Sequence, residues 1–141
     1  MKLTSPVALL VLLAVAGCGG GNDSFTEDYN RAVKPLSELK GDLGGGAGES
    51  NAAIAKEFDR LAGRTRATRE NLAGLEPPDE AREEMDELLA GLADVTEDLS
   101  AVARATREAD AVKQRKASAR LVRSSGAVQR AEKALQRAVA G

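Results

Sequence analysis

The fold is decided by residues 79–140, which read DEAREEMDELLAGLADVTEDLSAVARATRE (79–108) and then ADAVKQRKASARLVRSSGAVQRAEKALQRAVA (109–140). This stretch has no proline, so it predicts either one helix of about sixty residues or two helices that fold back on each other. Apolar or small residues recur in its first part at steps of four and three, the spacing of one helix face. They are Ala81, Met85, Leu88, Leu92, Val95, Leu99, Val102, Thr106 and Ala109.

The apolar pattern changes phase near Asp110. Continued in the same steps, it falls on cations, namely Lys113, Lys116, Arg120, Arg123, Arg130 and Arg137. The apolar or small positions lie one residue away, at Ala117, Leu121, Ser124, Val128, Ala131, Leu135 and Ala138. Aspartate is a favoured N-cap, so Asp110 favours a new helix and an antiparallel hairpin with arms of ~45 Å. One long coiled coil with a skip residue is the alternative.

Two more helical patterns precede this hairpin. The first consists of Phe25, Tyr29, Ala32, Leu36, Leu39 and Leu43, and the second of Ile54, Phe58, Leu61, Thr65, Thr68, Leu72 and Leu75. Ser24, with Glu27 three residues later, predicts a capping box for the first helix. Pro35 predicts a kink or an early end of that helix, because proline removes a backbone hydrogen bond. Ser50 or Asn51 is the expected cap of the second helix.

No stretch has the alternating pattern of a strand, so the predicted fold class is all-α. We expect an up-down antiparallel helical bundle of about four helices with coiled-coil-like seams. The bundle domain is predicted to span 24–140, with helices at about 24–40, 51–75, 78–108 and 110–139 and a Gly-rich loop at 41–50. Thr65 and Thr68 interrupt the second seam. They would mark a polar niche in the core, or, as we favour, positions near the surface of a thin bundle.

The amino-terminal segment MKLTSPVALLVLLAVAGC (1–18) has the layout of a secretory signal. A positive start at Lys2 precedes an apolar run of about ten residues, which is too short to span a bilayer. Val15, Ala16, Gly17 and Cys18 resemble the lipobox of bacterial lipoproteins, in which an aliphatic residue and two small residues precede a cysteine. An ordinary secretory signal with a chance cysteine, or a short membrane helix, is the alternative.

The lipobox resemblance implies that diacylglycerol is attached to the Cys18 sulfur and that the chain is cleaved between Gly17 and Cys18. Residues 1–17 would then be a removed signal peptide, and 18–23 a flexible tether that holds the domain near the membrane. Two or three acyl chains anchor a protein stably, at ~0.8 kcal/mol for each buried CH₂ group. We therefore expect a lipid-anchored protein on the extracytoplasmic face of the cell membrane.

The composition excludes much of enzyme chemistry. The 141 residues include no His, no Trp and a single Cys. The chain therefore has no imidazole base, no His-ligated metal site and no internal disulfide, so we expect neither catalysis nor a metal or other cofactor. Four carboxylates of the third helix fall between its seam positions and are predicted to face water: Glu84, Glu87, Asp94 and Asp98. No small-molecule substrate is evident, although a transport-linked solute binder would be possible if the bundle held a pocket.

The near-neutral total charge conceals two oppositely charged helices. Residues 79–108 hold ten acidic and three basic residues, and residues 109–140 hold two acidic and eight basic ones. Opposite charges along an antiparallel pair favour pairing within the bundle. The alternative is that the basic helix binds anionic lipid headgroups or wall polymer through Lys113, Arg115, Lys116, Arg120 and Arg123. Nucleic acid is not expected, because aromatic residues for base stacking make up only 2% of the chain.

A second resemblance covers residues 72–138. Leu72, Leu75 and Pro77-Pro78 are followed by heptad leucines and then by an Ala-rich basic segment. This arrangement resembles small, uncharacterised helical lipoproteins of high-GC bacteria, although this chain lacks the His that the pattern often has near Met85. The resemblance implies an exported helical bundle. We therefore expect a structural or accessory factor of the cell envelope that acts through contacts with a protein partner still to be identified.

Overall fold

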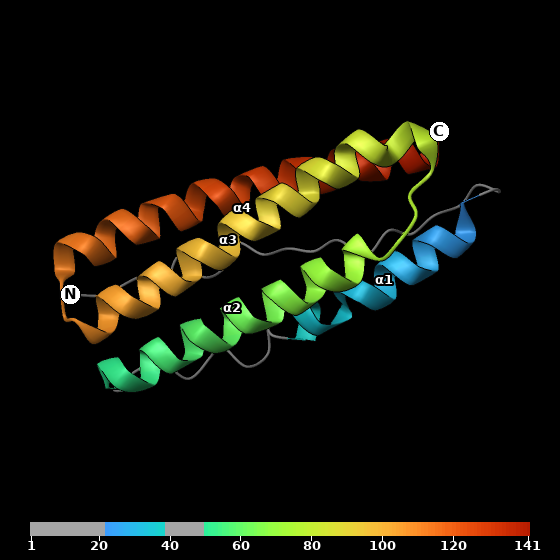
Figure 1. The fold of residues 1–141 in the computed structure, drawn as a ribbon. Coiled ribbons are helices and arrows are strands. Elements are labelled where there is room, and N and C mark those ends of the chain that lie inside the picture. The colour runs from blue at the N-terminus through green and yellow to red at the C-terminus, as the bar shows by residue number, and fades with distance from the viewer. Residues whose placement is uncertain (1–21, 39–49) are drawn as a thin grey trace.

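The computed structural model describes residues 22–38 and 50–141. These residues form four α-helices and no strand: α1 (Asp23–Glu38), α2 (Asn51–Ala73), α3 (Arg82–Arg107) and α4 (Ala111–Ala140). A 3-10 turn, η2 (Asp79–Ala81), precedes α3. The helices lie side by side in an up-down arrangement, with α3 packed between α2 and α4 (Figure 1). The predicted all-α antiparallel bundle is confirmed, and the helical hairpin replaces the alternative of one long helix.

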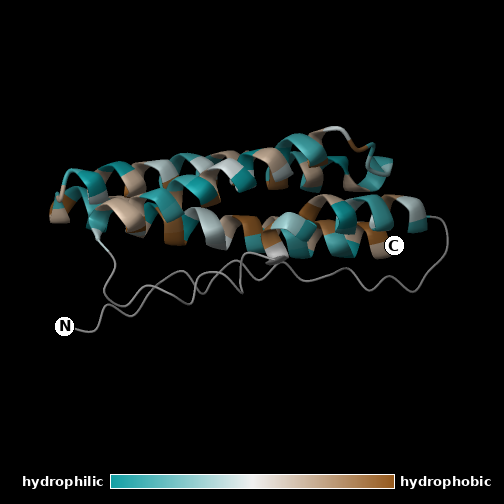
Figure 2. Cartoon of the chain, turned by 90° about the horizontal axis from the view of Figure 1, so that it is seen from below, coloured by the Kyte–Doolittle hydropathy of each residue, from teal (hydrophilic) through white to brown (hydrophobic). Residues whose placement is uncertain are grey.

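Each helix buries most of its predicted seam positions. Thirteen apolar side chains that are at least nine-tenths buried carry most of the core: Tyr29, Val33, Leu36, Leu61, Leu72, Met85, Leu88, Leu92, Val95, Leu99, Val102, Val128 and Leu135. Brown hydrophobic and teal hydrophilic segments therefore alternate along the helices (Figure 2). Ala109, the last member of the third pattern, is exposed because the chain has already left the helix there.

The first helix begins earlier than the sequence predicted. Its first backbone bond runs from the Thr26 N–H to the Asn22 oxygen, so the helix begins at Asp23 and Ser24 lies inside it. The predicted capping box at Ser24 is therefore wrong. Of the two outcomes expected at Pro35, a kink or an early end, the early end is wrong, since α1 continues through Pro35 to Glu38. Leu39 and Leu43, the last positions of that pattern, lie outside the described residues.

The second helix begins where the sequence indicated. The Ser50 hydroxyl accepts a hydrogen bond from the Ala53 N–H at 3.2 Å, which identifies Ser50 as the N-cap. Thr65 and Thr68 are each 1% exposed, so their predicted place near the surface is wrong. Thr65 donates a hydrogen bond to the Leu61 carbonyl at 2.9 Å, which satisfies its hydroxyl within the helix.

Helix α1 covers only part of the bundle. Asn22 contacts Val139, and Tyr29 contacts Glu132. The two contacts are seven residues apart on each side, so the amino-terminal segment and α4 run antiparallel in register. Continued in this register, Glu38 at the end of α1 lies near the level of residue 123. The end near Asn22, with 65–73, 82–97 and 124–140, is called the four-helix half. Among the described residues, the remainder is the three-helix half, formed by 51–64, 98–107 and 111–123 (Figure 1).

Helices α3 and α4 approach each other closely at Gly91. A Cβ atom placed on Gly91 would lie 2.9 Å from the Val128 Cγ2 atom, closer than side chains pack. Small buried residues on α4, Ser124 and Ser125, follow the same interface. Because α3 packs against both α2 and α4, it buries residues on two sides, including positions outside its predicted seam such as Ala103 and Ala105.

Candidate functional site

The predicted lipid-attachment segment lies outside the described residues. Val15, Ala16, Gly17 and Cys18 all precede Asn22, the first described residue. Asn22 is itself held at one end of the bundle, where its Nδ2 atom donates a hydrogen bond to the Val139 carbonyl at 3.1 Å. The beginning of α1 and the end of α4 therefore meet at the same end of the molecule. Lipid attachment at Cys18 stays a prediction.

The five predicted anion contacts all lie exposed on the amino-terminal part of α4. Two of the five are engaged in ion pairs. The Lys113 Nζ atom lies 2.7 Å from a Glu108 carboxylate oxygen, and the Arg120 Nε atom lies 3.1 Å from the Asp98 Oδ1 atom. The structure therefore uses both of these cations inside the hairpin.

The other three predicted contacts have their charge directed to solvent. Arg115 donates a hydrogen bond from Nε to the Ala111 carbonyl, a local contact within α4. Arg115, Lys116 and Arg123 form no ion pair with another residue of 22–38 or 50–141. Pairing between the acidic and basic helices is thus sparser than their total charges suggest.

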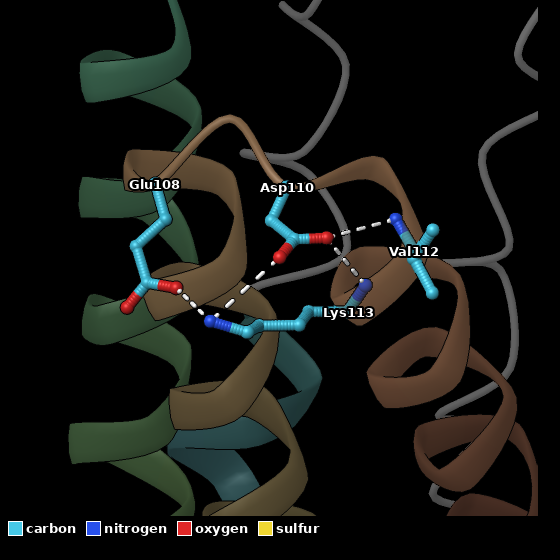
Figure 3. A network of polar contacts seen from close by, with 4 residues as sticks. All are labelled: Glu108, Asp110, Val112 and Lys113. Carbon is cyan, nitrogen blue, oxygen red and sulfur yellow. Dashed lines mark hydrogen bonds and ion pairs between the residues drawn. The ribbon is translucent and has the colours of Figure 1, made fainter.

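The turn between α3 and α4 is a compact polar network (Figure 3). Ala109 has a φ of 53°, and the Asp110 N–H bonds back to the Ala105 carbonyl at 3.1 Å while the Ala109 N–H bonds to that of Thr106. This pattern is a Schellman motif, which usually places glycine where Ala109 stands. The turn needs only Glu108, Ala109 and Asp110 to reverse the chain.

Asp110 begins α4 as the sequence predicted. One of its carboxylate oxygens, Oδ1, accepts hydrogen bonds from the N–H groups of Val112 at 3.0 Å and Lys113 at 2.9 Å. These backbone bonds, first of all that of Lys113, lower the pKa of Asp110, and the charge of Lys113 adds to the effect. In return, the hydrogen bond and charge of Glu108 raise the pKa of Lys113, with Asp110 contributing less.

The structure contradicts the prediction that Asp98 faces water. Asp98 is 8% exposed and lies between α3 and α4. Its Oδ2 atom accepts a hydrogen bond from the Ser124 hydroxyl at 2.9 Å, and its Oδ1 atom pairs with Arg120. Through these two contacts, Asp98 of α3 is bonded to two residues of α4. Glu87 and Asp94 are exposed as predicted, whereas Glu84 is half-buried.

A second buried polar pair, which the sequence pattern did not indicate, joins α1 to α4. The Tyr29 hydroxyl lies 3.5 Å from the Glu132 Oε1 atom, and the two residues are 1% and 3% exposed. Burial, and then the nearby Glu132 charge, raise the pKa of Tyr29 above its ordinary value. Glu132 directly follows the seam position Ala131, and this adjacency is the only sequence signal that could have pointed to it.

The described residues bring together few chemically reactive groups. Within 22–38 and 50–141, no three His, Cys, Asp or Glu side chains gather in a way that could hold a metal ion. Across the same ranges, none of the helices has the length and hydrophobicity needed to cross a membrane. Comparisons of the chain with protein-family models, curated proteins and solved structures found no match.

Proposed function

We propose that this protein is a lipid-anchored accessory factor of a bacterial cell envelope. Its Cys18 sulfur carries diacylglycerol, residues 1–17 are removed, and the helical bundle stands on the extracytoplasmic face of the cell membrane. The bundle acts through contacts with an envelope protein rather than through catalysis. No cofactor is needed apart from the acyl groups on Cys18.

A single observation carries this proposal: a complete lipobox, Val15 to Cys18, ends four residues before the bundle begins at Asn22. An anchor placed there needs no membrane-spanning helix in the folded domain. A thiol is the strongest nucleophile among the side chains and suits transfer of a lipid. The absence of His from the whole sequence supports an interaction factor over a hydrolase or a metalloenzyme.

The anchor is tested by replacing Cys18 with serine in the bacterial host. The unaltered chain should lose residues 1–17, gain the mass of diacylglycerol and any further acyl group, and partition into detergent. Cys18→Ser should show neither the added mass nor the partitioning. A chain with both Cys18→Ser and Ser24→Cys is the matched control, because it restores a thiol outside the lipobox and should stay unmodified.

An unaltered chain whose mass shows no lipid would refute the anchor. Addition of lipid to the Cys18→Ser, Ser24→Cys control would show that the Val15–Cys18 context does not direct the modification. The proposed protein partner is tested separately, by chemical crosslinking in intact membranes. A single crosslinked species should appear with the unaltered chain and disappear with Cys18→Ser, which would no longer be held at the membrane.

A further inference from the structure

The exposed side of α4 carries a regular row of cations. Lys116, Arg123, Arg130 and Arg137 follow one another at intervals of seven residues, which is nearly two turns, so they share one side of the helix about 10.5 Å apart. All four are exposed, and none forms an ion pair with a described residue. This row is called the α4 basic row.

No exposed carboxylate within α4 neutralises this row. Glu132 is the one acidic residue of Ala111–Ala140, and it is buried against Tyr29. The other acidic residue of the region, Asp110, is bound to backbone N–H groups at the start of the helix. The exposed side of α4 therefore presents positive charge along ~30 Å between Lys116 and Arg137.

Two exposed apolar side chains accompany the cations. Val112 and Val122 are 53% and 44% exposed, and they are the exposed large hydrophobic residues of the described chain. Both belong to α4. Cations whose stems lie beside exposed apolar side chains are typical of a helix that rests on a membrane surface, with its charges at the headgroups.

The end of α4 also lies close to the proposed anchor. Asn22 is bonded to Val139, and the four residues from Cys18 to Asn22 can span at most ~14 Å. Arg137 lies within the last turn of α4 and belongs to the same end of the bundle. Lipid attachment at Cys18 would therefore keep the basic row within reach of the bilayer.

We propose that α4 lies along an anionic phospholipid surface through the α4 basic row. This inference rests on the anchor proposed above for its location, but the binding itself is a property of the described residues. An anionic bilayer attracts basic residues within about a Debye length of its surface, with contributions that add up along the row. The exposed carboxylates Glu83, Glu87, Asp94 and Glu97 belong to α3, so an anionic surface selects α4 as the contacting helix.

A membrane accounts for more of these observations than a soluble polyanion does. A polyanion would use the cations but would gain nothing from the exposed valines. It would also gain nothing from an anchor beside the end of α4. On the membrane, the anchor and the basic row act together, because one fixes the bundle at the surface and the other orients it.

The test uses the full chain with Cys18→Ser, so that no acyl group contributes to binding. Binding is measured by co-sedimentation with vesicles of phosphatidylcholine alone and of phosphatidylcholine with phosphatidylglycerol. Neutral vesicles report the contribution of the apolar amino-terminal segment. Three of the four charges of the row are removed together by Arg123→Gln, Arg130→Gln and Arg137→Gln. The matched control is Lys56→Gln, Arg66→Gln and Arg104→Gln, which removes the same charge from exposed sites on α2 and α3.

We expect the row variant to bind phosphatidylglycerol vesicles at least about tenfold more weakly than its parent, and the control to change much less. Binding by the parent should also fall in about 0.5 M salt, where the Debye length shrinks to roughly 4 Å. Circular dichroism of both variants verifies that the helices remain folded. Equal losses in the two variants, or equal binding to neutral and anionic vesicles, would overturn the proposal.

A parallel measurement with soluble polyphosphate separates the two kinds of partner. Loss of polyphosphate binding in the row variant, without loss of vesicle binding, would overturn the membrane proposal in favour of a polyanion. Because these assays use a chain that carries no acyl group at residue 18, their outcome is independent of the mass measurement that tests lipid attachment to Cys18. A lipidated chain with no contribution from α4 would refute this inference alone.

Discussion

The two halves of the bundle reach burial by different means. In the four-helix half, large side chains such as Tyr29, Leu72, Leu88 and Leu92 are 1% exposed and fill the space between the helices. In the three-helix half, most buried apolar residues are alanines, namely Ala55, Ala62, Ala103, Ala105 and Ala117. Alanine lets helices approach but removes little apolar area from water. The hydrophobic free energy that stabilises the three-helix half is therefore smaller than that of the four-helix half, where larger side chains are buried.

The largest expected difference between the halves is in the cost of leucine truncation. Leu88→Ala in the four-helix half should lower the free energy of unfolding by about 3–4 kcal/mol, because it leaves a cavity in a closed core. Leu121→Ala in the three-helix half should cost only about 1 kcal/mol, because Leu121 is half-buried. Urea unfolding followed by circular dichroism measures both values. An equal loss of unfolding free energy in the two variants would contradict the difference described between the two halves.

A smaller effect is expected where two helices touch without room for a side chain. Gly91→Ala should destabilise the protein by about 1–3 kcal/mol, since the new methyl group would overlap Val128. Gly63→Ala is the matched control in a helix of the other half, where nothing lies within 4 Å of the added Cβ atom. That variant should gain about 0.5–1 kcal/mol from helix propensity. A stabilising Gly91→Ala would contradict the close contact.

The single tyrosine reports directly on the four-helix half at high pH. Burial raises the pKa of Tyr29, so the folded state favours the neutral phenol. This contribution to stability is complete at neutral pH and declines as the pH rises above the ordinary tyrosine value of about 10. Absorbance of tyrosinate should therefore appear only above that pH and together with loss of helical circular dichroism. Titration near pH 10 in a fully helical protein would refute the burial.

The smallest effect is expected at the turn that ends the three-helix half. Ala109→Gly should stabilise the protein by about 1 kcal/mol or less, because glycine adopts the positive φ of this position without strain. Thermal unfolding measures the change. Ala73→Gly, at an exposed position where α2 ends, is the control and should not stabilise. A loss of stability in Ala109→Gly would argue against the described turn.

Acid should weaken the same turn. The lowered pKa of Asp110 means that its capping bonds stabilise the fold above the pKa it has in the unfolded chain, and that this stability is lost as the pH falls through the lower folded value. Asp110→Asn keeps an N-cap of similar quality but removes the titrating charge. Its unfolding midpoint should therefore depend less on pH than that of the unaltered chain.

The sequence predicted correctly those features that depend on the pattern of a single helix or on a single capping side chain. The seam of α3 and the change of phase at Asp110 follow from a period of 3.6 residues, and Asp110 and Ser50 are caps because of their side-chain chemistry. Reasoning from one face failed for Asp98. This carboxylate lies outside the predicted seam, but α3 is flanked on two sides and so buries a second face. The Tyr29–Glu132 pair has no counterpart in the pattern of a single helix face, because it joins residues that are 103 positions apart in the chain.

By itself, the sequence determined the helical class and the opposite charges of residues 79–108 and 109–140, because each depends on residues close together in the chain. It favoured a hairpin at Asp110 over one long helix, and the structure decided for the hairpin. The tertiary structure alone decided which half of the bundle α1 covers, which cations are paired and which remain for a partner. Those outcomes depend on how helices far apart in sequence pack together. Thus Arg120 is held by Asp98, while Lys116 and Arg123 on the same helix are directed to solvent.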